Sequence, residues 1–326
     1  MKKKLLGKKI TTKTIFQDAA ERTIVPLPTG EGEPRQFFTY DLKTPVIESN
    51  WETELQGIQR SFRKREFGIY RPQTEFPEID ITLNDNLDTI ELWPLYDVHV
   101  GSPQHDQELF RRHMDKLANR PNAFSWNGGD AVENITDKKM GHTPTDNETQ
   151  IMNVTKEFAV VQHKLLFSIP GNHEARTYKE SQTSTGKRIA DNLQVPYFGD
   201  YVFCTLKWRG NNFRLLAHHG AGGAQTPGAQ RNAARKELTW AKPDILWTGH
   251  LHAPMADTVY LTDYDQRTGR VYERGAVVII SPSYLKYFGG YAAAMRMQPG
   301  LRGLSVVTLN EDGRIDTSIH ARGKRL

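Results

Sequence analysis

The sequence predicts an α/β domain preceded by an N-terminal extension, and three observations support this. From residue 88 onward, short apolar segments typical of strands alternate with amphipathic segments typical of helices. Five of the strand-like segments end directly before a polar residue of a type that binds metals. Residues 1–87 lack this alternation. We therefore place an extension at 1–87 and the main domain at 88–326.

Taken in order, the elements of the domain follow from periodicity and from chain-breaking residues. We expect strands at 89–96, 124–126, 165–169, 213–217 and 245–247, and helices at 109–117, 151–161 and 229–240. Residues 259–317 are rich in strand-forming residues. Pro94 interrupts the first strand, and because proline cannot donate to a ladder, we expect an edge position or a bulge there.

The extension combines a basic tail, an amphipathic helix and a connector. Apolar residues at 51, 55, 58 and 62 have helical spacing, and the segment 60–65 forms a basic cluster at the end of this helix. We interpret it as a helix with a solvated basic end, in preference to a nucleic-acid contact. Prolines at 72 and 77 indicate an extended connector. The role of residues 1–87 stays open.

The net charge of +5 comes from the first residues of the chain. The sequence has 43 Lys and Arg against 38 Asp and Glu, and residues 1–14 contain six lysines and no acid. Everything after residue 14 therefore carries 5 − 6 = −1. The lysine tail fits a solvated end as well as an arm that attracts phosphates, so basicity alone does not indicate a nucleic-acid-binding domain.

The composition also bears on compartment. No apolar run approaches the eighteen or so residues of a membrane span, and the basic start is followed by a polar stretch, so we expect no signal peptide. Cys204 is the only cysteine, so no intrachain disulfide can form, and we expect a buried thiol. These features predict a cytoplasmic protein without a membrane partner.

Polar residues of the types that commonly bind metals follow the strand-like segments in five clusters. The clusters are Asp97-Val98-His99, Gly129-Asp130, Gly171-Asn172-His173-Glu174, His218-His219-Gly220 and Gly249-His250-Leu251-His252. Their mixture of oxygen and imidazole ligands suits Mn²⁺, Fe²⁺, Zn²⁺ or Ni²⁺, and contains too many imidazoles for Ca²⁺ or Mg²⁺. On strands, residues i and i+2 point the same way, so D-x-H and H-x-H would each direct two ligands into one pocket.

In this order, the five motifs resemble those of the calcineurin-like metallophosphoesterase superfamily over roughly residues 90–310. Three stretches most resemble the phosphoesterases of bacteriophages, with some similarity to double-strand-break repair nucleases in D-x-H-x-G. They are Asp97-Val98-His99-Val100-Gly101, Gly171-Asn172-His173-Glu174-Ala175-Arg176 and His219-Gly220-Ala221-Gly222-Gly223. The resemblance implies a four-layer α/β/β/α sandwich of two mixed sheets, with metals at the strand ends.

The resemblance also implies roles for individual residues. One metal would be held by Asp97, His99 and His252, and the other by Asn172, His219 and His250. Asp130 would bridge the two, because a carboxylate has two oxygens. The nucleophile would be a hydroxide shared by two divalent ions. Mn²⁺ is the first choice for these ions, with Fe, Zn or Ni as alternatives. Such ions lie roughly 3.5–4 Å apart. His173 would be the general acid.

Several assignments stay open at this level. His218 and His219 compete as the fourth-motif ligand, and the family pattern, with the ligand directly before glycine, favours His219. Arg176, His142 and His218 are candidate substrate contacts. No arginine follows Asp130 closely, which argues against a protein phosphatase. The segment 184–187 hints at a phosphate loop but lacks a required glycine. Aromatic residues at 284, 287, 288 and 291 could stack on bases, although core packing explains them more simply.

The sequence thus predicts a metal-dependent phosphoesterase that hydrolyses phosphodiesters, with DNA or RNA as the leading substrate. A phosphodiesterase of cyclic or modified nucleotides and a phosphomonoesterase are alternatives. A catalytically silent binding module is a rival of another class, but every expected ligand position is filled. The sequence does not indicate the oligomeric state.

Overall fold

The computed structural model describes residues 67–70, 77–134, 145–290 and 299–322, together with Ala293 and Arg296. Contacts divide the chain into two compact units, Met1–Phe62 and Arg63–Leu326, and all described residues belong to the second. The predicted helix at 51–62 and the candidate substrate contact His142 lie outside the described residues. Within the described residues, no helix is long and apolar enough to cross a membrane.

The larger sheet has seven strands in the order β1-β2-β6-β7-β8-β10-β9. Its strands are β1 Phe67–Tyr70, β2 Glu78–Leu83, β6 Tyr201–Trp208, β7 Asn211–His218, β8 Ile245–Thr248, β9 Met255–Asp265 and β10 Arg270–Ile280. The sheet is mixed, because β2–β6, β7–β8 and β8–β10 are parallel pairs and the other three are antiparallel. The parallel pairs around β8 bring the carboxyl ends of β7, β8 and β10 to one edge.

The smaller sheet has five strands in the order β12-β11-β3-β4-β5. Its strands are β3 Ile90–Leu92, β4 Ala123–Asn127, β5 Leu165–Ser168, β11 Arg302–Leu309 and β12 Ile315–Arg322. The strands β3, β4 and β5 run parallel, while β11 and β12 are antiparallel to their neighbours. This sheet is also mixed, and β3, β4 and β5 end together at one edge.

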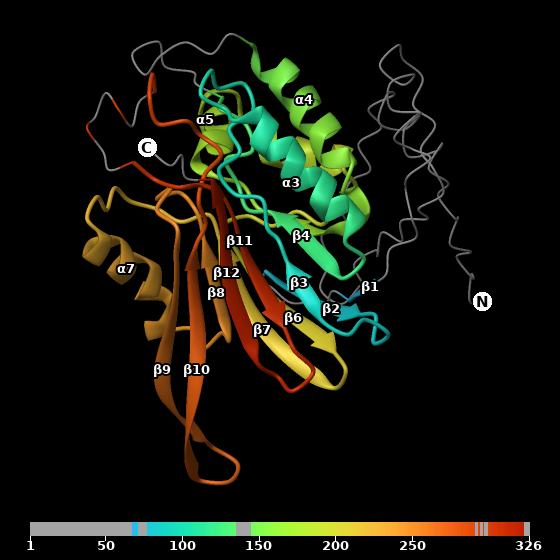
Figure 1. The fold of residues 1–326 in the computed structure, drawn as a ribbon, viewed down its shortest axis with the longest axis vertical. Helices are drawn as coiled ribbons and strands as arrows, with labels where there is room; N and C mark the ends of the chain where they lie inside the picture. Colours follow the sequence, from blue (N-terminus) through green and yellow to red (C-terminus); the bar gives the residue numbers. More distant parts are fainter. Residues whose placement is uncertain are drawn as a thin grey trace, which may run out of the picture. The chain divides into compact units, whose positions relative to one another are not determined.

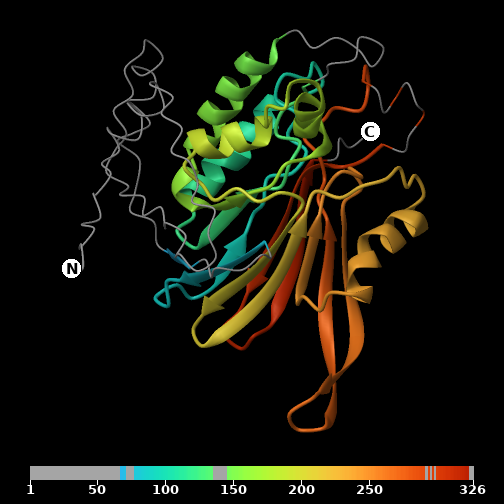
Figure 2. The same cartoon turned by 180° about the vertical axis from the view of Figure 1, so that it is seen from behind.

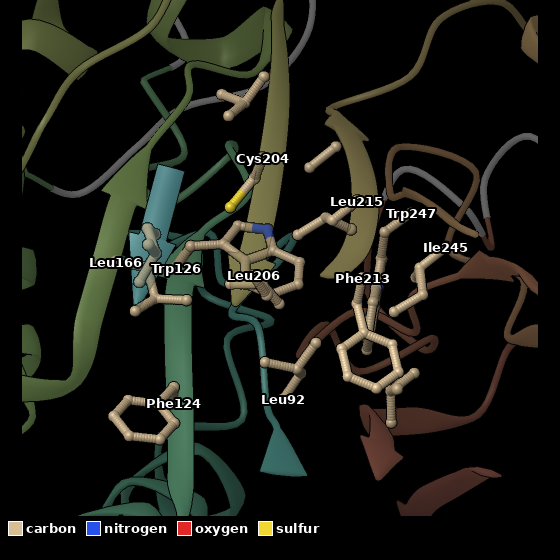
Figure 3. Packing of buried hydrophobic residues seen from close by; sticks show 14 of the residues in the cluster. Leu92, Phe124, Trp126, Leu166, Cys204, Leu206, Phe213, Leu215, Ile245 and Trp247 are labelled. Carbon is tan, nitrogen blue, oxygen red and sulfur yellow. The ribbon is translucent and has the colours of Figure 1, made fainter. Parts of the chain in front are cut away.

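The main hydrophobic core lies between the two sheets. It takes Phe124 and Trp126 from the smaller sheet and Leu206, Leu215 and Trp247 from the larger one, all at most 2% exposed. Figure 3 shows Trp126 between the two sheets, close to Leu206. The Trp126 ring meets the Trp247 ring edge to face at 5.2 Å between centroids. Cys204 is a buried free thiol in this cluster, as predicted.

Helices cover the outer face of each sheet. Figure 1 shows α3 (Gln107–Asn119) and α4 (Asn147–Ala159) together on the side of the smaller sheet. The helices α5 (Asn172–Ser181) and α6 (Thr185–Asn192) follow β5. On the other side, α7 (Pro227–Arg235) and the short 3₁₀ helix η3 (Lys236–Thr239) cover the larger sheet (Figure 2). The result is the predicted four-layer α/β/β/α sandwich of two mixed sheets.

The helices begin where the sequence offers capping side chains. Asp106 accepts a hydrogen bond from the Leu109 amide at the start of α3, and Asp146 accepts one from the Thr149 amide at the start of α4. Ser184 does the same for Lys187 at the start of α6. The segment 184–187, rejected above as a phosphate loop, is therefore a helix start.

Two details differ from the sequence prediction. The strands β1 and β2 lie in the larger sheet, so the compact unit begins before residue 88; alternating residues in Glu78–Leu83 point Ile79 and Ile81 into the core. The prediction of an edge or bulge at Pro94 was wrong. β3 lies inside its sheet, between β11 and β4, and pairing with β11 stops at Leu92, before the proline.

Candidate metal centre

The seven residues predicted to bind metals come together at the edge where the parallel strands of both sheets end. Asp97 follows β3, Asp130 follows β4, and Asn172 begins α5 after β5. His219 follows β7, while His250 and His252 follow β8. Loops after parallel strands meet at one edge, which explains why residues distant in sequence share one site.

The first group of donor atoms belongs to Asp97, His99 and His252. The Nε2 atom of His252 lies 3.1 Å from Asp97 Oδ1 and 3.4 Å from His99 Nε2. His99 Nε2 is 4.0 Å from Asp97 Oδ1. These three atoms are close enough to bind one ion together.

The second group belongs to Asn172, His219 and His250. The amide oxygen of Asn172 lies 2.8 Å from His250 Nδ1 and 3.2 Å from His219 Nε2. With Asp130, the two histidines form another set that could hold an ion. The two groups correspond to the two ligand sets that the resemblance implied.

Asp130 lies between the groups. Its Oδ2 atom is 3.2 Å from His219 Nε2 and 3.9 Å from His99 Nε2, so one oxygen faces both sets. Its Oδ1 atom accepts a hydrogen bond from the backbone amide of His173 at 2.8 Å. A bridge through Asp130 would therefore use one oxygen. This differs from the sequence argument, which assigned one oxygen to each ion.

Polar contacts outside the cluster hold three of the histidine rings so that the opposite ring nitrogens face inward. His99 Nδ1 lies 2.9 Å from a Glu133 carboxylate oxygen, and His219 Nδ1 lies 3.0 Å from the Gly128 carbonyl. His250 Nε2 lies 2.8 Å from the Gly222 carbonyl. Because these oxygens only accept, each of these nitrogens carries a proton, and the opposite nitrogen, which faces the cluster, is the one that would coordinate an ion.

The electrostatics of the site favour a bound cation. Burial disfavours charge on His219, but the carboxylates of Asp130 and Asp97 outweigh burial and raise the pKa of His219 to about 10. For His99, Glu133 and the same two aspartates outweigh burial and raise the pKa to about 9. The two aspartates are at most 1% exposed. Buried carboxylates so placed require positive charge nearby, which divalent ions would supply. The residues therefore fit a metal centre.

The backbone is left-handed at five of the seven candidate ligands. Asp97, His99, Asp130, His250 and His252 all have φ between 51° and 66°. Residues other than glycine seldom adopt this conformation, and clusters of such residues are found at functional sites. The expectation that D-x-H and H-x-H lie on strands was wrong, because both motifs lie in loops beyond the strand ends. Both motifs still bring their ligands to the cluster.

Two glycines allow close approach to the aspartates. A Cβ atom at Gly171 would lie 2.1 Å from Asp130 Oδ1, and one at Gly249 would lie 2.5 Å from Asp97 Oδ2. Any side chain at these positions would displace the carboxylates. The glycines of the G-N-H and G-H-x-H motifs are therefore required by packing.

Glu174, the last residue of the third motif, supports the site without joining the donor atoms. Its carboxylate accepts hydrogen bonds from the amides of Asp130 (2.9 Å), Ala131 (2.8 Å), Val132 (3.2 Å) and Gly171 (2.7 Å). It thereby fixes the loop of Asp130 to the start of α5. The spacing of Glu174, three residues after the helix cap, was the sequence signal.

His173 lies beside the cluster and contacts Glu133 and Arg176. Its Nδ1 atom hydrogen-bonds the Glu133 carbonyl, and its Nε2 atom lies 3.8 Å from Asp130 Oδ2. Two guanidinium nitrogens of Arg176 each lie 3.0 Å from a ring nitrogen of His173. With the Nδ1 proton donated to the carbonyl, only the contact to Nε2 can be a hydrogen bond. Burial lowers the pKa of His173 to about 4.

The structure places the two remaining candidates differently. His218 points to the opposite side of β7 from His219, because side chains alternate along a strand. Its ring is 5.1 Å from that of Tyr201, and its Nε2 atom is 3.8 Å from a Glu237 carboxylate oxygen. It is not brought to the cluster. Arg176 contacts the ring of His173, which lies beside the cluster.

Comparisons with known proteins add little to this geometry. No family model matches the chain, and no curated protein matches it. Among solved structures, Haemophilus influenzae NAD nucleotidase (NadN) aligns over 72% of this chain and 50% of its own length, with 10% identity and a TM-score of 0.36. A Thermotoga maritima protein and a hypothetical protein from Thermus thermophilus each share 14% identity over 72% of this chain. They are covered over 99% and 100%, with TM-scores of 0.31 and 0.32. Scores this low identify neither family nor activity.

Sequence reasoning missed the residues that support the site. Glu133 orients His99, and Asn134 donates to the His173 carbonyl at 2.7 Å. Gln150 of α4 accepts from the Asn134 amide at 2.9 Å. No local pattern marks these residues, because each acts through a partner distant in sequence.

Proposed function

We propose that this chain is a metal-dependent phosphoesterase with a dinuclear centre. The observation that carries this proposal is the pair of donor groups, Asp97/His99/His252 and Asn172/His219/His250, on either side of Asp130. Two divalent ions held there would lower the pKa of a bound water and neutralise charge on the phosphoryl oxygens. Mn²⁺ is the proposed metal, with Fe, Zn or Ni as alternatives, because oxygen and imidazole ligands occur in similar number.

The exposure of the donors supports access by a substrate. Asp97, His99, Asp130 and His219 are at most 5% exposed and form the floor of the centre. Asn172 is exposed, and His250 and His252 are partly exposed. An ester bound over these three more exposed residues would approach the four buried donors from the same side.

His173 is the proposed proton donor to the leaving oxygen. The Glu133 carbonyl holds its Nδ1 proton, so Nε2 is the atom that exchanges a proton with substrate. Burial lowers the pKa of His173 to about 4, so near pH 7 only the small fraction that is protonated at Nε2 can donate. Protonation at Nε2 would be stabilised by the carboxylate of Asp130, 3.8 Å away.

Leaving-group dependence tests this role. We expect His173→Ala to retain its bound Mn²⁺ and to slow hydrolysis of an alkyl ester by about 10²- to 10⁴-fold, since alkoxides require a proton. Hydrolysis of a p-nitrophenyl ester should fall much less, because nitrophenolate leaves without one. Steady-state rates on both esters, with metal content measured in parallel, check this. Equal losses on both esters would remove His173 from the role.

For the substrate, we propose phosphodiesters, with nucleic acid first and small cyclic or modified nucleotides second. The resemblance of the D-x-H-x-G element to repair nucleases supports this order. The lysine tail and the basic segment 60–65 are consistent with it. A panel with Mn²⁺ should contain single- and double-stranded DNA, RNA, cyclic nucleotides, and aryl phosphate mono- and diesters. Failure to cut any polynucleotide would contradict the nuclease preference and leave the metal centre untouched.

A further inference from the structure

The segment 281–290, here called the 281–290 loop, leaves the larger sheet at the edge that carries the metal centre. β10 runs parallel to β8, and the Ser281 amide donates to the Thr248 carbonyl at 2.8 Å. Figure 1 shows β8 and β10 side by side. Because β8 leads directly into His250 and His252, the loop after β10 begins next to those ligands.

Tyr284 fixes the start of this loop to the loop that carries Asp97. Its amide donates to the Asp97 carbonyl at 3.0 Å, and its carbonyl accepts from the Asp106 amide at 2.7 Å. Its side chain is fully buried, with the ring 5.1 Å from that of Phe110 and the hydroxyl 2.9 Å from His113 Nδ1. Tyr284 is therefore a core residue, as the simpler interpretation of the aromatic cluster predicted.

The tip of the same loop is attached to Gln104 by two hydrogen bonds. The Lys286 amide donates to the Gln104 carbonyl at 2.8 Å, and the Gln104 side chain donates to the Gly289 carbonyl at 2.9 Å. Between these two attachments lies Phe288, which is 83% exposed. Its ring meets that of Tyr287 edge to face at 5.1 Å. An exposed ring on an anchored backbone loses little conformational entropy when a ligand packs on it.

The exposed part of this loop carries two kinds of group. Phe288 offers an aromatic face, and the exposed Lys286 offers an ammonium group two residues earlier. Single-stranded nucleic acids and nucleotides are bound by this combination, in which bases stack on aromatic rings and cations meet phosphates. An aliphatic or purely ionic ligand would use only one of the two groups.

We propose that Phe288, with Lys286, forms a base-stacking platform beside the metal centre, so that the substrates are phosphodiesters carrying a nucleobase. This inference rests on the proposed phosphoesterase function and narrows it. The exposed aromatic Tyr260 provides a matched comparison. It pairs with Gly275 on β10, five residues before the end of that strand, and so lies about 17 Å along the sheet from the ligand edge.

Two diesters with the same leaving group separate base recognition from chemistry. They are the p-nitrophenyl ester of thymidine 5′-monophosphate and ethyl p-nitrophenyl phosphate, each assayed with Mn²⁺. We expect Phe288→Ala to lower the ratio of kcat/KM for the nucleoside ester to that for the ethyl ester by about 5- to 150-fold, chiefly through KM. Phe288→Trp should preserve the ratio, and Tyr260→Ala should leave both rates unchanged.

An unchanged ratio in Phe288→Ala, or a ratio lowered equally by Tyr260→Ala, would overturn the platform. If the wild-type protein hydrolysed neither ester, the proposed function would fail instead. The platform would then be decided by calorimetric titration of thymidine 5′-monophosphate into the protein with Mn²⁺. Weaker binding by Phe288→Ala than by wild type and Tyr260→Ala would support it, and equal binding by all three would overturn it.

Discussion

At the scale of single residues, Asp130 shows how the site divides work between the oxygens of one carboxylate. Oδ1 takes a backbone hydrogen bond from His173, and Oδ2 faces both His219 and His99. The first contact fixes the carboxylate plane, so the second oxygen stays between the two donor groups. A residue with one hydrogen-bonding atom could not do both.

His218, the last residue of β7, and His219, directly after it, give a matched pair for testing the ligand assignment. We expect His219→Asn to weaken Mn²⁺ binding by more than the roughly 10- to 100-fold typical of changes outside the ligand shell. His218→Asn should leave Mn²⁺ affinity near that of wild type, because His218 faces Tyr201 and Glu237. Titration calorimetry with Mn²⁺ measures both. A larger loss in His218→Asn would reverse the assignment.

What could be predicted at this scale was set by local chemistry. Asp97, His99 and His219 could be found because ligand-type side chains directly follow apolar segments. Glu133 could not, since its importance comes from a 2.9 Å contact with the outer nitrogen of His99 after folding. Glu174 could be noticed, but whether it binds metal or backbone amides depends on the loop that packs over it.

At the scale of elements, the loops determine the geometry of the ligands more than the strands do. Asp97 and His99 have similar positive φ angles, as do His250 and His252. The strands were predicted from periodicity, and β4, β5, β7 and β8 lie where expected. The left-handed turns after them leave no periodic signal, because the hydrogen bonds that stabilise them, such as that from the His250 amide to Asp97, are long-range.

The helix α3 carries a buried titratable group whose effect on stability can be predicted. His113 is 7% exposed, and its Nδ1 atom pairs with the Tyr284 hydroxyl. Burial, with Lys116 next, lowers the pKa of His113 from 6.5 to about 4. The unfolded chain therefore gains this proton at a higher pH than the folded protein does. The stability that His113 contributes is present above pH 6.5 and is lost as the pH falls towards 4.

We expect His113→Gln to remove this part of the acid sensitivity. Between pH 6.5 and 4, the free energy of unfolding of wild type should fall more steeply with pH than that of the variant. The difference in slope corresponds to the uptake of up to one more proton on unfolding of wild type. The accumulated difference is on the order of 3 kcal/mol. Urea unfolding at a series of pH values measures it. Parallel curves for the two proteins would show that His113 titrates normally in the folded state.

At the scale of the whole domain, the sandwich explains why two donor groups meet. β3, β4 and β5 of one sheet and β7 and β8 of the other end at the same edge, and the core between the sheets fixes their separation. Trp126 and Trp247, one from each sheet, are in edge-to-face contact just below the ligands that follow their strands. The donor positions are therefore set by a rigid core.

The order of the motifs predicted this architecture, while the sequence alone did not reveal the full extent of the domain. β1 and β2 precede the first motif by many residues, yet they extend the larger sheet through the parallel pairing of β2 with β6. Strand pairing across more than a hundred residues has no signature in local composition. The alternation in Glu78–Leu83 indicates a strand but not its partner.

The central claim is that one chain holds two divalent ions bridged through Asp130. Electron paramagnetic resonance during titration with Mn²⁺ tests it directly, because two bridged Mn²⁺ ions couple magnetically and isolated ions do not. We expect binding to saturate at two ions per chain with a coupled spectrum, and Asp130→Ala to lose the coupling. Saturation at a single ion, uncoupled six-line spectra at every ratio, or no binding would contradict the dinuclear centre.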